Sequence, residues 1–330
     1  MTNLGLSGLY KFDQLLHLYS QLLLIRKVEL SIGRESKKNS FRTPIHLAIG
    51  QEAIAVGISA YLSPNDRIFG NHRSHAHYLA LGGSVQKLIL EILGKRGGCS
   101  GGKGGSMHIS SIDTGFIGSM PIVAGTIPIA VGASLEFDNE SKNISVCYFG
   151  DGASEEGVFH EALNFAAKFN APTLFVCENN LFSSHMHIDQ RQNSRSISRF
   201  ADSAGILNFE VDGNSLLDVM NCAKEAVNHV RMNRKPAFIE ALTYRIYSHV
   251  GFDTDLNVGL NRISDLKEWS GKDPISSLRK TISENFPNEV DWDVIENKIN
   301  GFVEDSWIYG LNAEFPDSSE LFENVYWSKE

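Results

Sequence analysis

Residues 144–177 form a strand–helix–strand pattern that constrains the fold more than any other part of the sequence. The segments 144–149 (ISVCYF) and 172–177 (PTLFVC) are short apolar runs rich in β-formers, and 154–169 between them carries apolar residues at helical spacing. Two strands joined by a helix predict a parallel pair with a right-handed crossover. The pattern therefore favours an α/β fold, with a mainly parallel sheet and helices on both of its faces.

The rest of the chain supplies further elements for such a fold. Apolar residues at helical spacing predict helices over 10–30, 46–62, 84–93 and 215–232, and a run of β-formers predicts a strand over 236–244. Residues 97–105 form a glycine-rich loop, and the chain beyond residue 273 is expected to be helical and then irregular.

Composition and charge exclude several classes of protein. The chain is 42% hydrophobic and 21% charged, which rules out a disordered or collagen-like chain. Its 30 Lys and Arg against 39 Asp and Glu give a net charge of −9, which argues against a partner that is nucleic acid or an anionic membrane. The four cysteines have no CxxC spacing, and neither a signal peptide nor a membrane span is evident. We therefore expect reduced thiols and a cytoplasmic protein.

Polar residues follow both strands of the central unit. Gly150-Asp151-Gly152 comes directly after the first strand, and Asn179-Asn180 comes directly after the second. Because ligands of parallel sheets bind beyond the carboxyl ends of the strands, Asp151 and Asn180 are expected to lie together there. A carboxylate and an amide oxygen suit Mg²⁺ or Ca²⁺, and a helix beginning near Ser154 would favour a diphosphate at the same place. A tight turn with a helix cap would explain the Gly-Asp-Gly triplet alone, but the strands and the double Asn favour a metal–diphosphate site.

The segment 150–180 resembles the thiamine-diphosphate motif, which begins with GDG and ends with NN. The chain is similar to the alpha subunit of the thiamine-dependent decarboxylating component of 2-oxo acid dehydrogenase complexes, a type shared by pyruvate, branched-chain and acetoin dehydrogenases. The resemblance covers about residues 10–285. Five further blocks agree in the same order: HLAIGQEAIAVG from His46, NHRSHAH from Asn71, GCSGGKGGSMH from Gly98, IVAGTIPIAVGA from Ile122 and TYRIYSH from Thr243.

This resemblance implies a thiamine-diphosphate-binding fold with a defined metal site. Asp151 and Asn180 match the Mg²⁺ ligands of the family, and the backbone carbonyl of Phe182 matches a third. Gly152 and Ala153 match positions whose backbone contacts the diphosphate.

The resemblance also implies residues that hold the two ends of the cofactor. Arg73 and Arg245 match the two arginines that grip the terminal phosphate, which a guanidinium can bind in bidentate fashion. His72, directly before the first of them, is placed with the cofactor-binding residues. Pro121 and Val123 match positions that hold the aminopyrimidine ring through backbone groups.

Two histidines are expected to be catalytic. His46 and His249 match the active-site histidines of the family, where an imidazole can bind the substrate's carboxylate or carbonyl and pass protons. His75 matches a histidine with a supporting role near the phosphate arginine.

Two other kinds of site fit the sequence less well. His72, His75 and His77 could suggest zinc, but no nearby Cys and no HExxH motif supports it. The glycine-rich loop around Lys103 has the spacing of a P-loop, but Gly104 stands where a Ser or Thr would bind Mg²⁺. We interpret this loop as close-packed beside the cofactor or a partner subunit.

The chain departs from the family pattern on the side expected to face the substrate. His72 replaces a tyrosine of pyruvate enzymes, Tyr247 replaces a histidine, and Val250 replaces the serine that is phosphorylated in animal enzymes. Residues 124–126 and 181–185 also depart from the usual pattern. The substrate therefore cannot be assigned by analogy.

The resemblance implies a half enzyme. In this family the glutamate that activates the cofactor comes from a beta subunit, so we expect an α₂β₂ heterotetramer with active sites between α and β. The implied reaction is oxidative decarboxylation of a 2-oxo acid with acyl transfer to a lipoyl acyltransferase. The expected organisation is a helical N-terminal extension (1–45), one diphosphate-binding α/β domain (46–255) and a helical or irregular C-terminal extension (256–330).

Two alternatives stay open at this point. The first is a thiamine-dependent ketol or aldehyde transferase, transketolase-like or synthase-like, or an acetoin-type enzyme that acts without lipoamide. The second is a cofactor-free regulatory or scaffold subunit, against which the intact Asp151, Asn180, Arg73 and Arg245 argue.

Overall fold

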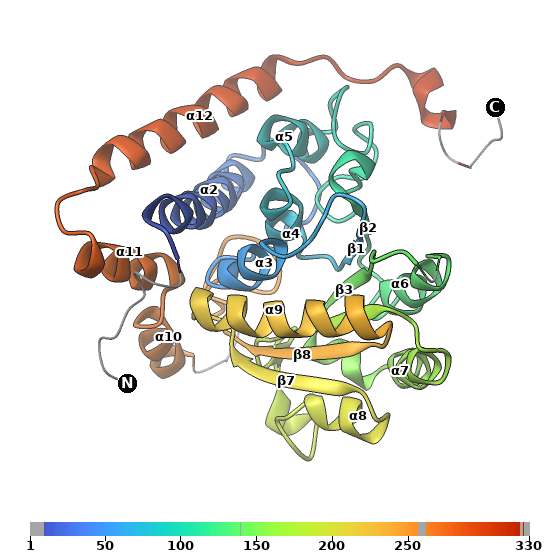
Figure 1. The fold of residues 1–330 in the computed structure, drawn as a ribbon. Helices are drawn as coiled ribbons and strands as arrows, with labels where there is room; N and C mark the ends of the chain where they lie inside the picture. The colour runs from blue at the N-terminus through green and yellow to red at the C-terminus, as the bar shows by residue number, and fades with distance from the viewer. Residues whose placement is uncertain (1–9, 139, 257–261, 324–325, 327–330) are drawn as a thin grey trace.

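A six-stranded parallel sheet forms the centre of the computed structural model, which describes residues 10–138, 140–256, 262–323 and 326 (Figure 1). The strand order is β2-β1-β3-β4-β8-β7, and every pairing in the sheet is parallel. The predicted α/β fold with a mainly parallel sheet is confirmed. The strands are β1 (Arg67–Gly70), β2 (Phe116–Ser119), β3 (Ser145–Gly150), β4 (Thr173–Asn179), β7 (Leu207–Asp212) and β8 (Ala237–Leu242).

Helices cover both faces of the sheet, and the side chains that alternate between these faces along each strand divide the core into two parts. In β3, Val146 and Tyr148 pack into the apolar cluster that includes α2, α3 and α9, whereas Cys147 and Phe149 pack into the cluster of α6 and α7 (Figure 1). Successive side chains of a strand point to opposite faces, so a strand buried on both sides must be apolar throughout. The helices of this domain are α2 (Phe12–Lys37), α3 (Glu52–Ser59), α4 (His75–Ala80), α5 (Val85–Leu93), α6 (Thr126–Leu135), α7 (Gly157–Phe169), α8 (Ser198–Ser203) and α9 (Leu216–Asn233).

Three helices follow the sheet along the chain: α10 (Ile263–Ser270), α11 (Pro274–Asn285) and α12 (Trp292–Asn312). α11 and α12 pack against α2, and α12 also packs against α5, so helices from the N-terminal and C-terminal regions pack together outside the sheet (Figure 1). The helical N- and C-terminal regions are therefore as expected, and the three-part division of the chain stays a prediction. Within the described residues, no helix combines the length and apolar character needed to cross a membrane.

Two predicted helices begin later than expected. The helix predicted over 46–62 covers only Glu52–Ser59, because Gly50 has φ +96° and turns the chain before the helix starts. The stretch predicted over 154–169 begins at Gly157, after a 3₁₀ turn over Asp151–Glu155. The helix N-terminus expected near Ser154 is thus a 3₁₀ turn, and the α-helix starts three residues later.

The periodicity of the sequence missed three strands for identifiable reasons. β1 and β2 have four residues each, too few for a period to show. β7 is an edge strand with half-exposed residues and two acidic side chains, so it lacks the apolar signature of the central strands.

Candidate active site

A cleft lies beyond the carboxyl ends of the strands, with an empty volume of about 920 Å³ when its open mouth is included. Most of its walls come from the segments that follow β1, β2, β3, β4 and β8, the place where parallel sheets bind ligands, and His46 and Gln51 line it from the segment before α3. The structure brings together every residue that the sequence analysis assigned to the site. These residues are His46, His72, Arg73, Pro121, Val123, Asp151, Gly152, Ala153, Asn180, Phe182, Arg245 and His249.

The oxygen ligands predicted for a metal come from neighbouring strands. Asp151 directly follows β3 and Asn180 directly follows β4, and both side chains are buried. Asn180 Nδ2 donates to Gln51 Oε1 (3.2 Å), and Asn180 Oδ1 accepts the backbone N–H of Phe182 (3.3 Å), so both ends of the amide are held. Burial raises the pKa of Asp151, and the guanidinium of Arg191 on its Oδ2 counteracts the rise. A hard cation in the cleft would hold this carboxylate ionised, so the donor set fits Mg²⁺.

Gly152, the second glycine of the Gly150-Asp151-Gly152 triplet, stands where packing leaves no room for a side chain. A Cβ added to Gly152 would lie 2.6 Å from Ser183 Oγ and 2.9 Å from Ser183 Cβ. Ser183 belongs to the hairpin of β5 (Phe182–Ser183) and β6 (Met186–His187), which therefore seats directly on the turn after β3. A diphosphate could approach the bare backbone at Gly152 closely.

Two buried cations face the cleft. Arg73 Nη1 donates to the carbonyl of Leu47 (2.5 Å), and Arg245 Nε donates to that of Tyr247 (2.9 Å). Burial and the nearby Arg245 lower the pKa of Arg73 to about 9, and burial and the nearby Arg262 lower that of Arg245 to about 10. Cations that destabilise one another in a buried site are stabilised by a polyanion, so the pair suits a diphosphate.

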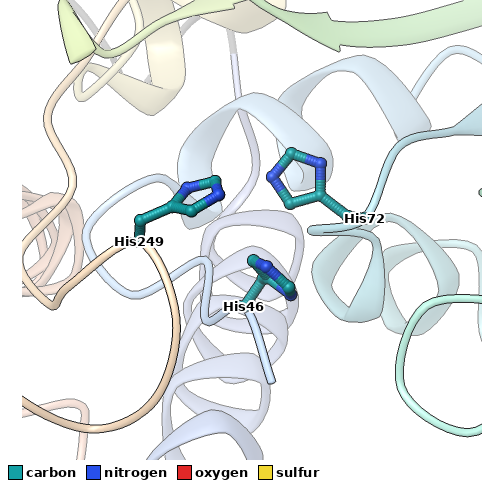
Figure 2. A group of neighbouring side chains, drawn as sticks. All are labelled: His46, His72 and His249. Atoms are coloured by element: carbon teal, nitrogen blue, oxygen red, sulfur yellow. The ribbon is translucent and has the colours of Figure 1, made fainter. Parts of the chain in front are cut away.

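Three histidines converge in the same cleft. The ring of His46 lies 4.6 Å from that of His72 and 5.1 Å from that of His249 between centroids, and the last two are 5.3 Å apart (Figure 2). Burial first, and then the Arg73 cation, lowers the pKa of His46 to about 3, of His72 to about 2 and of His249 to about 4. All three imidazoles are therefore neutral at neutral pH and can each donate one hydrogen bond and accept another.

His72, His75 and His77 are close in the sequence but do not lie together in the fold. His75 and His77 do not join His72 but lie in separate buried networks away from the cleft. His75 bonds Glu29 (3.2 Å) and Ser106 (2.8 Å), and its supporting role stays a prediction; His77 bonds Glu178 (3.1 Å). The zinc cluster that the sequence argued against is accordingly not formed by these three residues.

The glycine-rich loop is close-packed on a carboxylate. Glu91 is fully buried and accepts backbone N–H groups from Ser100, Gly102, Gly104 and Gly105 at 2.6–3.2 Å. The amides that would cradle phosphate in a P-loop are thus already bonded. None of residues 97–105, all of which the structure describes, lines the cleft.

Several residues near the site were missed by the sequence analysis. Gln51 stands inside a recognised block but was given no role, and its Nε2 is buried with no partner. Arg191, Asp255 and Arg262 contact the predicted site residues from outside the recognised blocks. The positions of these three residues in the sequence do not indicate that they lie near the site, because their contacts depend on how the loops fold.

Comparison with known proteins identifies the family of the chain. The family described as dehydrogenase E1 component matches residues 20–308. The chain is 34% identical to the alpha subunit of acetoin:2,6-dichlorophenolindophenol oxidoreductase of Bacillus subtilis, over 96% of this chain and 95% of that one. It is 32% identical to the pyruvate dehydrogenase E1 component subunit alpha of Rickettsia felis (93% and 94% covered), and 33% identical to that of Porphyra purpurea (97% and 95%). The family match over most of the chain and these identities show that the chain belongs to the dehydrogenase E1 component family.

Proposed function

We propose that this chain is the alpha subunit of a thiamine-diphosphate- and Mg²⁺-dependent oxidoreductase that decarboxylates a 2-oxo acid. The observation that carries the proposal is the convergence of two hard-oxygen ligands and two buried arginines on one cleft, at the ends of parallel strands. The family match and the names of the relatives support the same reaction class.

Each group of residues has a role in this proposal. Asp151, Asn180 and the carbonyl of Phe182 hold Mg²⁺, and Arg73 and Arg245 hold the terminal phosphate. The backbone at Gly152 and Ala153 contacts the diphosphate, His72 adds a further contact, and Pro121 and Val123 hold the aminopyrimidine.

The chemistry needs both the cofactor and the histidines. When bound, thiamine diphosphate supplies a thiazolium ring that accepts the electron pair left as CO₂ departs. His46 and His249 are neutral, so they can orient the substrate's carbonyl and carboxylate by hydrogen bonds and accept or return a proton.

A second subunit completes the site in this proposal. The rim of the cleft exposes apolar side chains at Ile122 (69% exposed) and Val123 (50%), and Ile129 (47%) continues this surface along α6. Such a surface beside an active site suits a protein partner. We infer that a beta subunit covers it, supplies the activating glutamate and forms the α₂β₂ enzyme. Full activity of the purified single chain would contradict this.

The metal assignment can be tested directly. Asp151→Ala in the α–β complex should abolish Mg²⁺-dependent binding of thiamine diphosphate, measured by titration of intrinsic fluorescence. Asp202→Ala removes an exposed carboxylate that accepts a hydrogen bond from Asn208 and does not line the cleft, and should leave the titration unchanged. Equal affinity in Asp151→Ala and wild type would refute the assignment.

The identity of the group that accepts the product of decarboxylation distinguishes the two candidate functions that remain. The proposed acceptor is the lipoyl group of an acyltransferase, whereas the alternative is an acetoin-type or ketol-transferring enzyme that works without lipoamide. A panel of 2-oxo acids and acetoin should be assayed with the complex, with 2,6-dichlorophenolindophenol or a lipoyl domain as acceptor. Turnover with the dye and none with any lipoyl domain would favour the alternative.

A further inference from the structure

Arg191 connects the turn after β3 with the segment that follows Asn180. Its Nη2 donates to Asp151 Oδ2, its Nη1 donates to Glu155 Oε1, and its Nε donates to the carbonyl of Met186 (3.0 Å). The side chain is only 6% exposed although its segment lies at the surface. One guanidinium therefore contacts a predicted metal ligand, a second carboxylate and the hairpin at once.

The neighbouring residue strengthens the same connection. Gln192 Nε2 donates to Ser154 Oγ (3.0 Å) and to Glu155 Oε1 (2.9 Å). Together with the contact of Ser183 against Gly152, both ends of the 182–192 segment are fastened to the 3₁₀ turn Asp151–Glu155. The carbonyl of Phe182 and the carboxylate of Asp151 are thereby held on one rigid unit.

The two oxygens of Asp151 are not equivalent in this arrangement. Oδ2 is taken by Arg191, whereas Oδ1 receives no hydrogen bond from another described side chain. A carboxylate that ligates a metal through one oxygen is normally oriented by a hydrogen bond to the other. Glu155 offsets the charge of Arg191, so the contact orients Asp151 without adding net positive charge beside a cation.

We propose that Arg191 is a positioning residue for the metal ligand Asp151, and that cation binding and the seating of the 182–192 segment are coupled through it. This inference rests on the proposed metal site. The guanidinium fixes the carboxylate so that Oδ1 points to the cation, and it ties the segment that supplies the Phe182 carbonyl. A cation that binds both groups therefore tightens the segment against the turn.

The test measures Mn²⁺ binding by electron paramagnetic resonance, on the complex of the full chain with its beta subunit and in the presence of thiamine diphosphate. Arg191→Gln should bind Mn²⁺ about 10- to 100-fold more weakly than wild type. Arg191→Lys keeps a charged donor and should recover part of the loss. Arg195→Gln is the matched control, since Arg195 lies in the same region but pairs with Asp189, and it should stay within about twofold of wild type.

Hydrogen exchange distinguishes a positioning role of Arg191 from a purely structural role. Mn²⁺ should increase the protection of amides 182–192 in wild type and Arg195→Gln, but not in Arg191→Gln. If Arg191→Gln does not fold, Glu155→Gln, which keeps Arg191 and removes one anchor, should show a smaller loss of Mn²⁺ affinity in the same direction. Equal affinity in wild type and Arg191→Gln overturns the inference, and tighter binding would make Arg191 a competitor of the cation. Absence of Mn²⁺ binding in wild type would instead refute the proposed metal site.

Discussion

Asp255 holds Arg245 in position at the edge of the cleft. Its Oδ2 lies 3.2 Å from Arg245 Nη2 and equally 3.2 Å from Nη1 of Arg262, and all three side chains are buried. One carboxylate thus serves two guanidiniums. The arrangement leaves a surplus of positive charge that an anion in the cleft would neutralise.

Asp255→Asn should destabilise the ligand-free chain, because two buried cations would lose the carboxylate that they share. We expect a loss of about 3 kcal/mol in the free energy of unfolding. Thiamine diphosphate should restore more stability to the variant than to wild type, since its phosphates replace the missing charge. Melting temperatures with and without cofactor measure both effects. An unchanged melting temperature, or a smaller cofactor-induced rise in the variant, would contradict this account.

The strand-end rule predicted from sequence that Asp151 and Asn180 lie together, whereas the other residues of the cleft required other information. Asp151 and Asn180 follow strands that their composition predicts, so their proximity could be expected from topology. Arg73, Arg245 and the histidines came only from the family resemblance, since an isolated Arg or His carries no signal of its site. Asp255 and Arg191 could not be predicted, because they reach the site through loops whose paths depend on tertiary packing.

The strongly apolar elements of the fold were also the predictable ones. β3 and β4 are buried on both faces, and their composition was enough to predict them as strands. The stretch from His46 to Gly50 was predicted to begin a helix, but Leu47, Ala48 and Ile49 are apolar because they are buried in the core, and only His46 of this stretch lines the cleft. In a short segment, apolar residues that are buried in the core can thus have the same spacing as the buried face of a helix.

His249→Ala should separate catalysis from cofactor binding. The histidine lies in the cleft but its side chain makes no hydrogen bond with another described side chain, so its loss should leave thiamine diphosphate affinity within a few-fold of wild type. Removal of a positioned proton-transfer group should lower turnover by about 100-fold or more. Single-turnover assays with a 2-oxo acid, together with cofactor titration, measure the two quantities. Loss of cofactor binding with normal turnover at saturation would refute the catalytic role.

The three neutral histidines predict an acid-sensitive fold. Their pKa values of about 3, 2 and 4 lie below the ordinary value of 6.5, so the unfolded chain takes up protons first as the pH falls. Stability present above pH 7 is therefore lost progressively between about pH 7 and pH 2. His72→Tyr removes one of these groups, and should reduce the loss between pH 7.5 and 5.5 by about 1 kcal/mol. Chemical denaturation at the two pH values tests this, and an identical loss in wild type and variant would contradict it.

Glu91→Gln should loosen the glycine-rich loop. The carboxylate accepts four backbone N–H groups, and an amide in its place would turn an NH₂ group toward donors that need an acceptor. Hydrogen bonds to a buried charge contribute about 1.5–3 kcal/mol each, so we expect a loss of about 3 kcal/mol or more in the free energy of unfolding. Cleavage of the 97–105 loop by a protease should accelerate in parallel. Glu284→Gln removes a carboxylate from an exposed helical ion pair with Lys280, and should change stability by less than about 0.5 kcal/mol. Similar behaviour of the two variants would show that the loop does not depend on Glu91.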